Sequence, residues 1–268
     1  MSEHRVRIDV DELGVATVTL DRAEKHNALD PAMFDALVDA TTRLAADRSV
    51  RAVVLHGAGK SFCSGLDITG LADRKGTGPR DLLAREDGQV AGHGQRVAYG
   101  WSRVPAPVIA AITGNCFGGG LQIALGADIR FATPDARLSI MEVKWGLVPD
   151  MGITQSLPRL VGLDVAKELT FTGRIITGAE AKELGLVTHV VDDPLTAASE
   201  LAREIAGKSP HAVQAAKRLY EETWTGSDPA SALMLESKLQ VELMGSPNQI
   251  EAVTAGTAGR APAFVDPD

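Results

Sequence analysis

Residues 114–122 read Gly-Asn-Cys-Phe-Gly-Gly-Gly-Leu-Gln, between an apolar run typical of a strand (108–112) and one typical of a helix (121–127). Glycines at such a junction let backbone N–H groups approach a ligand near the positive end of a helix. This arrangement suits an oxygen that carries negative charge, either on a phosphate or on an enolate. The rest of the sequence decides between the two.

Two nucleotide-binding motifs fail on the spacing of their glycines. The Gly-Lys-Ser at 59–61 resembles the end of a P-loop, but that motif requires a glycine where Val54 stands. Gly118 and Gly120 resemble the start of a dinucleotide fingerprint, but its third glycine would fall at Ile123. Neither motif supports a phosphate site.

Composition and charge limit the kinds of partner. The chain has 268 residues, is 44% hydrophobic and 23% charged, and carries a formal net charge of −8. This acidic balance argues against nucleic-acid binding and against an anionic membrane surface. Cys63 and Cys116 form no disulfide framework, and the charged first residues lack the apolar centre of a signal peptide. We therefore expect a cytoplasmic protein.

One uncharged stretch, residues 104–127, is long enough to cross a bilayer. Pro105, Pro107 and the glycine run interrupt it. We therefore expect a strand, a turn and a helix inside a soluble core, and no membrane partner.

Strand and helix signals alternate in the first part of the chain. Asp30 followed by Pro31 predicts a helix start, because Asp caps a helix and Pro fits its first turn. The expected elements are strands 15–20, 52–55, 108–112 and 129–132, a helix from residue 31 and a helix over 121–127. This order is typical of an α/β core of repeated ββα units.

The pattern becomes purely helical at about residue 194. Three pairs of a capping residue and a proline, at 209–210, 228–229 and 246–247, mark helix starts. We expect a core of residues 1–194 and a C-terminal helical region of residues 195–268 that packs on the core or on a neighbouring subunit. Residues 70–94, rich in glycine and charge, are expected to form a mobile loop.

A second glycine loop follows the strand expected at 52–55. It reads Ser-Phe-Cys-Ser-Gly-Leu-Asp over residues 61–67. Two such loops can present backbone N–H groups to one oxygen, although each loop alone is equally well explained as a turn.

Together with other segments, the two loops resemble the crotonase family, the enoyl-CoA hydratase/isomerase superfamily. The resemblance runs from Val6 to Ala255 and includes Leu-Asp-Arg at 20–22, Asn-Ala-Leu at 27–29, Leu-Thr-Phe-Thr-Gly at 169–173 and Ala-Glu-Ala-Lys-Glu-Leu-Gly-Leu-Val at 179–187. It implies a crotonase-like (ClpP/crotonase) spiral of ββα units with a C-terminal helical region, and trimers that often pair into hexamers.

The resemblance also implies a site for an acyl-CoA substrate, with no metal and no cofactor, because coenzyme A is part of the substrate. By position, the backbone N–H groups of Leu66 and Gly119 correspond to the family's oxyanion hole. Removing a proton next to a thioester puts negative charge on its oxygen, and one such donor contributes about 3 kcal/mol. Asp67 is expected to tie its own loop down by hydrogen bonds. The implied CoA- and substrate-binding residues are Ser64, Gly65, Leu66, Asp67, Ile68, Gly118 and Gly119.

In the family's hydratases, two glutamates hold the water that is added. The first would stand at Gln122, which cannot transfer a proton as a carboxylate does, and the second is present as Glu142. The aligned position makes Glu142 the expected general base. Taken without the resemblance, Glu142 would be a surface acid or a partner of Lys144.

A third acid, Asp150, follows Glu142 by eight residues. The family's dienoyl-CoA isomerases carry an acid at this spacing; one carboxylate removes a proton from the acyl chain and the other returns one further along. In that subgroup the position of Gln122 usually holds an aspartate, so the match is incomplete. Asp150 is equally well placed to cap a helix that begins near Gly152.

We therefore expect double-bond isomerisation of an enoyl- or dienoyl-CoA, with Glu142 as the base and Asp150 as a second proton carrier. The alternative is an enoyl-CoA hydratase in which Glu142 works while Gln122 orients the water. Further alternatives are a CoA- or RNA-binding paralogue with little activity, and thioester hydrolysis or decarboxylation on the same scaffold. Residues 70–101 are expected to shape the acyl pocket.

Overall fold

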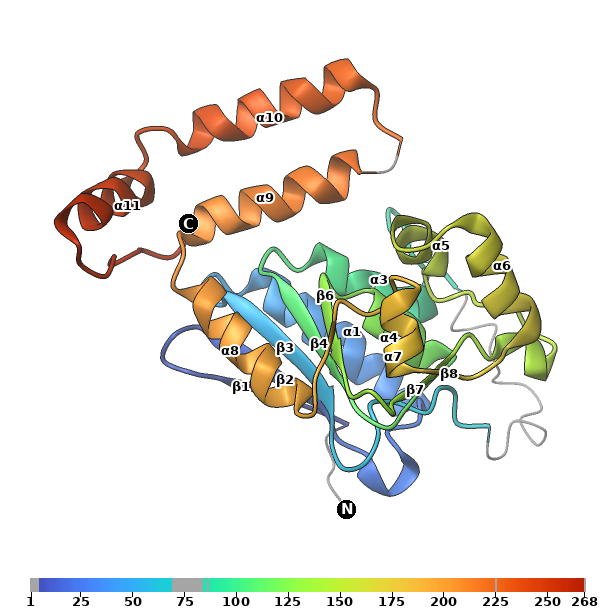
Figure 1. The fold of residues 1–268 in the computed structure, drawn as a ribbon. Helices are drawn as coiled ribbons and strands as arrows, with labels where there is room; N and C mark the ends of the chain where they lie inside the picture. Colours follow the sequence, from blue (N-terminus) through green and yellow to red (C-terminus); the bar gives the residue numbers. More distant parts are fainter. Residues whose placement is uncertain (1–4, 69–83, 86, 225, 268) are drawn as a thin grey trace.

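The computed structural model describes residues 5–68, 84–85, 87–224 and 226–267. Within these residues, the centre is a six-stranded sheet in the order β1-β2-β3-β4-β6-β9, with helices on both faces (Figure 1). β1 pairs antiparallel with β2, and the other neighbours are parallel. The strands are β1 (Val6–Val10), β2 (Val15–Leu20), β3 (Ala52–Gly57), β4 (Val108–Ile112), β6 (Ile129–Ala132) and β9 (His189–Val190).

The side chains of β4 show why the sheet is covered on both faces. All five residues of this strand are apolar and buried, as is usual for a central parallel strand. Alternate side chains point to opposite faces. Its first, third and fifth residues pack with α1 (Pro31–Ala46) and α3 (His93–Arg103), and its second and fourth pack with α8 (Pro194–Ala206).

A smaller sheet lies beside the glycine segment. It has the order β5-β7-β8, formed by β5 (Asn115–Phe117), β7 (Arg137–Ser139) and β8 (Ile176–Thr177). The loop before Ser64 pairs with β5, because Cys63 N donates to Asn115 O at 3.0 Å and Phe117 N donates to Cys63 O at 3.0 Å. The two glycine loops therefore lie side by side.

The predicted helix starts are confirmed. Asp30 accepts a hydrogen bond from Met33 N at 2.9 Å at the start of α1. Ser209, Asp228 and Ser246 likewise cap the three helices that follow them. These helices are α9 (Pro210–Thr223), α10 (Pro229–Leu243) and α11 (Pro247–Ala258).

The C-terminal helices differ in how they contact the core. α8 lies flat on the sheet, whereas α10 and α11 extend away from it beyond α9 (Figure 1). The division at residues 194 and 195 stays a prediction. In the described part of the chain, no helix combines the length and the apolar character needed to cross a bilayer. The remaining elements are η1 (Ala23–Lys25), α4 (Gly119–Leu125), η2 (Glu142–Trp145), α5 (Ile153–Ser156), η3 (Leu157–Arg159), α6 (Leu163–Thr172) and α7 (Gly178–Glu183).

Two expectations differ from the structure. α4 spans Gly119–Leu125, so it begins and ends two residues before the helix predicted at 121–127. Its first turn contains Gly120, which packs against the backbone of Cys63, where a side chain would overlap. The helix α3 was not predicted, and it begins within the segment expected to be a loop. Residues 69–83 and 86, which belong to that loop and to the expected acyl pocket, lie outside the described residues.

Candidate active site

The loop that contains Leu66 is held by the backbone of Leu29. Leu29 N donates to Gly65 O at 2.8 Å, and Asp67 N donates to Leu29 O at 2.9 Å. These two hydrogen bonds involve the carbonyl group of Gly65 and the N–H group of Asp67, the residues before and after Leu66. Within the described residues, the N–H of Leu66 donates no hydrogen bond, so it is free to bind a ligand.

The second loop places another free N–H group nearby. Gly118 N donates to Ser139 O at 2.9 Å, and Gln122 N donates to Gly118 O at 3.0 Å, while Gly119 N has no acceptor in the described residues. Gly65, at φ +86°, lies against this turn: a side chain there would come within 2.7 Å of Phe117 O and 3.7 Å of Gly119 N. The two N–H groups therefore belong to backbone segments in direct contact.

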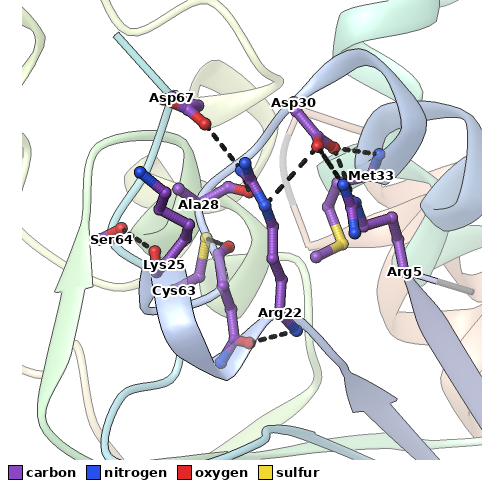
Figure 2. Close-up of polar contacts among 10 residues, drawn as sticks. Arg5, Arg22, Lys25, Ala28, Asp30, Met33, Cys63, Ser64 and Asp67 are labelled. Carbon is purple, nitrogen blue, oxygen red and sulfur yellow. Dashed lines mark hydrogen bonds and ion pairs between the residues drawn. The ribbon is translucent and has the colours of Figure 1, made fainter. Parts of the chain in front are cut away.

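A network centred on Arg22 fixes the first loop. Figure 2 shows its guanidinium between Asp67 and Asp30: Nη1 lies 2.8 Å from Asp67 Oδ2, and Nε lies 3.6 Å from Asp30 Oδ2. Nη1 also donates to Ala28 O at 3.0 Å. The side chains of Arg22 and Asp67 are only 11% and 12% exposed, so the pair is well shielded from solvent. Arg5 donates to Asp30 as well, at 2.8 Å.

Asn27 anchors the preceding residues of the same loop. Its side chain is buried, and its Nδ2 donates to the carbonyl oxygens of Ala58, Ser61 and Phe62 at 2.8–3.1 Å. Its backbone has φ +56°, a conformation that asparagine adopts more readily than most residues. The sequence identified Arg22 and Asn27 only as residues that match the family, and their roles in holding this loop were not predicted. Asn27 could have been recognised as a turn residue, since Asn adopts a positive φ in turns more readily than most residues.

Five of the seven residues expected to contact CoA and substrate, residues 64–68, lie along the same loop, and Gly118 and Gly119 lie in the second loop. Ser64 and Leu66 are partly exposed, and Ile68 is 43% exposed. Ser64 Oγ donates to Lys25 O at 3.3 Å. Gly118, at φ +51°, lies directly opposite Glu142, since a side chain there would come within 3.4 Å of Glu142 Oε1.

Glu142 is buried, which excludes the expectation of a surface acid. It is 9% exposed and lies at the start of η2. Gln122 Nε2 donates to Glu142 Oε1 at 2.6 Å, while Glu142 Oε2 is buried without a hydrogen-bond partner among the described residues. Lys144, the other expected partner, lies over the Trp145 ring instead.

The amide of Gln122 links Glu142 to the segment that contains Asp150. Gln122 Oε1 accepts a hydrogen bond from Met151 N at 2.8 Å. Asp150 does not cap the following helix, because the N-cap of α5 is Gly152 and no side chain caps that helix. The capping interpretation of Asp150 is therefore wrong.

Burial raises the pKa of both acids. Burial is the largest cause for Glu142; the charge of Asp150 raises this pKa further, and the hydrogen bond from Gln122 lowers it. Burial also raises the pKa of Asp150 above the ordinary aspartate value. Two carboxyl groups that interact electrostatically and both have raised pKa values are typical of a proton-transfer site.

The two cysteines are packing residues. Both are buried and free. Burial raises the pKa of Cys63 to about 12 and that of Cys116 well above its ordinary value. A thiol that stays protonated is a poor nucleophile, as expected from the lack of a neighbouring base. The described residues contain no group of three or more His, Cys, Asp or Glu that could hold a metal ion.

Sequence and fold both match one known family. The enoyl-CoA hydratase/isomerase family pattern matches residues 11–266. The rat mitochondrial Delta(3,5)-Delta(2,4)-dienoyl-CoA isomerase is 38% identical over 227 residues, which cover 81% of this chain and 69% of that protein. The chain belongs to the enoyl-CoA hydratase/isomerase family. It is therefore an enzyme, and an acyl-CoA substrate fits this family.

Proteins named as hydratases are also similar to this chain. The mouse mitochondrial methylglutaconyl-CoA hydratase is 31% identical over 270 residues, 98% of this chain and 83% of that protein. The solved enoyl-CoA hydratase from Bacillus anthracis has a TM-score of 0.89 and 31% identity, over 97% of this chain and 99% of that one. This agreement confirms the predicted crotonase-like α/β fold. Because both hydratases and isomerases are similar to this chain, the choice between the two reactions rests on the site residues.

Proposed function

We propose that this enzyme isomerises double bonds of an enoyl- or dienoyl-CoA, with Glu142 and Asp150 as its two proton carriers. The observation that carries the proposal is that Glu142 and Asp150 are close enough to interact electrostatically. In addition, Glu142 Oε2 is buried without a hydrogen-bond partner among the described residues. The identity with the rat dienoyl-CoA isomerase supports the same reaction.

In the first step, the ionised Glu142 would take a proton from a carbon of the acyl chain. The electron pair of that C–H bond would move into the conjugated system, and negative charge would reach the thioester oxygen. The N–H groups of Leu66 and Gly119 would donate to this oxygen, each contributing about 3 kcal/mol. These donors are backbone groups, so their positions depend on the two glycine loops.

In the second step, neutral Asp150 would donate its proton to a different carbon, and the electron pair would form the new double bond. Glu142 then holds a proton and Asp150 is ionised, so exchange with solvent restores the starting state. Burial raises the pKa of both groups above their ordinary values, and a group that accepts or donates a proton works best when its pKa is closer to the working pH.

The wider proposal follows from this reaction. Ser64, Gly65, Asp67 and Ile68 would line the CoA end, and no cofactor is needed because CoA arrives with the substrate. We also propose that the protein is cytoplasmic. A homotrimer or hexamer is proposed because α10 and α11 expose large apolar side chains that a neighbouring subunit could cover. They include Leu233, Met234, Val241, Ile250 and Val253, each at least 55% exposed. Sedimentation of the full chain tests this assembly: a monomer at micromolar concentration would contradict it.

The alternative is an enoyl-CoA hydratase in which Glu142 activates water. The hydratases among its relatives favour it. In the structure, however, Gln122 donates to Glu142 and accepts from Met151. One Nε2 hydrogen and one lone pair of Oε1 are already used, which leaves one donor and one acceptor position of the amide to orient a water molecule.

Both reactions are tested with crotonyl-CoA, longer 2-enoyl-CoAs and 3,5-dienoyl-CoAs. We expect the dienoyl-CoA to isomerise, with little 3-hydroxyacyl-CoA from the enoyl-CoAs, and Asp150→Asn to slow isomerisation by at least about a hundredfold. Asp164→Asn, at an exposed aspartate on α6, is the matched control. Rapid hydration that survives Asp150→Asn would reject the isomerase and support the hydratase.

A further inference from the structure

The wall of a cavity between α9 and the core carries an excess of positive charge. The cavity has a volume of about 430 Å³, within the range of about 300–1,000 Å³ that is usual for small-molecule sites. The charged residues of its wall are Asp128, Arg130, Arg159, Lys217 and Glu221. Three of them are cations and two are anions, so one positive charge is left over.

Four of these five charges pair with each other. Lys217 Nζ lies 2.7 Å from Asp128 Oδ2, and Arg159 Nη1 lies 2.6 Å from Glu221 Oε2. Asp128 Oδ2 also accepts a hydrogen bond from Val108 N at 2.7 Å, so this oxygen already has two donors. The excess charge is therefore that of Arg130, which forms no ion pair with any described residue.

Arg130 is a buried cation that only backbone carbonyl groups contact. It is 4% exposed; its Nε donates to Leu186 O at 2.8 Å, and its Nη1 donates to Ala127 O. Burial lowers the pKa of this guanidinium to about 10, although the charge of Asp128 acts in the opposite direction. Arg130 therefore stays charged at neutral pH. A buried charge without a counter-ion is unfavourable.

Arg130 also has a free donor. Its Nη2 donates no hydrogen bond within the described residues. The fully buried side-chain atoms without a partner in that part of the chain are Glu142 Oε2 and Arg159 Nε. Nη2 is not one of them, so it faces the open space of the cavity. Because Arg159 Nε is a second donor of the same wall without an acceptor, the wall suits a ligand with negatively charged oxygen atoms.

The rest of the wall suits an apolar ligand body. On α9, the lining residues recur at intervals of three or four positions, as expected for one face of a helix; they are Val213, Ala216, Tyr220 and Trp224. The rings of Tyr220 and Trp224 meet edge to face, with centroids 6.0 Å apart, and both side chains are more than half exposed. The cavity therefore opens to solvent at this end of α9.

The described residues show no space for a chain that would run from the thioester site along α4 into this cavity. A side chain at Gly119 would come within 2.8 Å of Met151 Sδ and 2.9 Å of Leu29 Cδ1. At the other end of α4, a side chain at Gly126 would overlap Ala98 O. A ligand of the cavity is therefore a separate molecule that enters from solvent.

We propose that the cavity under α9 binds a free monocarboxylic acid with an apolar body, separately from the thioester site. The carboxylate lies against Arg130, and the body packs on the α9 face that contains Val213 and Ala216. If each non-hydrogen atom takes about the 30 Å³ of a water-sized group, the space admits roughly a dozen such atoms. An acid of about eight carbons fits.

The test measures binding of octanoate, butyrate and 1-octanol to the full-length protein by calorimetry. We expect one octanoate to bind per chain. 1-Octanol has the same body without the charge, and it should bind at least about tenfold more weakly, since a hydrogen bond to a charged group is lost. Butyrate should also bind at least about tenfold more weakly, because full burial of each methylene improves affinity about fourfold.

Arg130→Met should weaken octanoate binding by at least about tenfold and remove the preference for octanoate over 1-octanol. Arg130→Lys keeps the charge and should keep most of this preference. Arg48→Met, at an exposed arginine outside the cavity wall, makes the same change in net charge and is the matched control. It should bind octanoate as the wild type does.

A second variant guards against a folding defect in Arg130→Met. Ala216→Phe places a ring in the cavity, leaves Arg130 intact and should weaken both octanoate and 1-octanol by at least about tenfold. Ala212→Phe, at an exposed residue of α9 outside the cavity wall, is its control and should keep wild-type affinity.

Three results would overturn the proposal. The first is equal binding of octanoate and 1-octanol, and the second is wild-type octanoate affinity in Ala216→Phe or in folded Arg130→Met. The third is displacement of octanoate by butyryl-CoA, which would place the acid in the thioester site.

A further pair of ligands identifies the source of the carboxylate. If Arg130→Met weakened suberyl-CoA but not octanoyl-CoA, the carboxylate would belong to an acyl chain, and the separate site would be rejected. If both thioesters bound Arg130→Met as they bind the wild type, the separate site would be supported. None of these measurements requires turnover, so failure of the proposed isomerase would leave this proposal untouched.

Discussion

Gln122 Nε2 lies 2.6 Å from Glu142 Oε1, and the other end of the same amide accepts a hydrogen bond from Met151 N. The amide thus joins the proposed base to the segment that follows Asp150. It also leaves Glu142 Oε2 as the oxygen without a partner among the described residues. Gln122 is therefore positioned to orient Glu142 and to influence its ionisation.

Replacing Gln122 by Leu should move the pH dependence of turnover. The hydrogen bond from Gln122 lowers the pKa of Glu142, so its loss raises that pKa. Because the base must be ionised, the rate falls as the pH drops through this pKa. We expect the acidic limb of kcat/KM against pH to shift to higher pH in Gln122→Leu.

Gln240→Leu, at an exposed glutamine of α10, is the control and should keep the wild-type profile. A uniform loss of kcat/KM in Gln122→Leu without movement of the acidic limb would mean that Gln122 has only a packing role.

Glu142→Gln should separate stability from activity. Turnover should fall by at least about a hundredfold, because the base is lost. The pKa of Glu142 is raised in the folded protein, so its contribution to stability is present below the ordinary glutamate pKa of about 4.3 and is lost as pH rises through the folded pKa. At neutral pH the variant should therefore melt higher than wild type, by roughly 2–4 °C for each kcal/mol.

The difference in Tm should vanish as the pH falls below about 4, where both proteins carry a neutral side chain at this position. Thermal melts between pH 3.5 and 8 measure this convergence. A variant that is less stable than wild type at neutral pH would contradict the sign.

Arg22→Met should lower both stability and kcat. It leaves Asp67, 12% exposed, without the guanidinium beside it, and breaking a buried ion pair typically costs about 3–5 kcal/mol. Loss of the contact also frees the loop that carries Leu66, and a small misplacement of a catalytic group costs up to about a hundredfold in rate. Urea unfolding and steady-state kinetics measure the two effects.

The exposed pair of Arg7 and Asp21, with N–O distance 2.9 Å, provides the control. Arg7→Met should cost less than about 1 kcal/mol and leave kcat unchanged. If Arg22→Met behaved like Arg7→Met, the network would not position the loop.

Gly65→Ala should disrupt the contact between the two loops. Its φ is +86°, and the added methyl group would lie 2.7 Å from Phe117 O. Gly245→Ala is the matched control, since Gly245 has φ +76° but open space around it. The conformational cost should be about 1–2 kcal/mol in both variants.

Steric overlap of the added methyl group with Phe117 should destabilise the folded state by a further ~1–3 kcal/mol in Gly65→Ala alone. This variant should also lose turnover. Chemical unfolding and kcat of the two variants give the comparison. Equal destabilisation, with turnover intact in both, would show that the loops do not need this close approach.

Local sequence patterns predicted the elements that depend on neighbouring residues. The strand over 108–112 and the capped start of α1 match the structure, because apolar runs and Asp-Pro pairs act within a few residues. The short strand β5 was missed, since its three residues lie within the glycine segment and pair only with distant ones.

The candidate site was less accessible to such reasoning. Resemblance suggested Glu142, but nothing local indicated that Gln122, twenty residues earlier, would donate to it. The contact between Arg22 and Asp67 spans 45 positions, and charge patterns do not identify a partner at that distance. The capping prediction for Asp150 was wrong because Gly152 takes that position at φ +90°.

The N–H groups of Leu66 and Gly119 belong to the main chain, so they are retained when side chains change. Exchange of one side chain for another cannot delete a peptide N–H; only proline removes it. Mutations can therefore replace the residues at 122, 142 and 150 one at a time while both donors are retained. A protein with this fold can therefore exchange the side chains that we propose to move protons, while it keeps the two N–H groups that we propose to stabilise an anion.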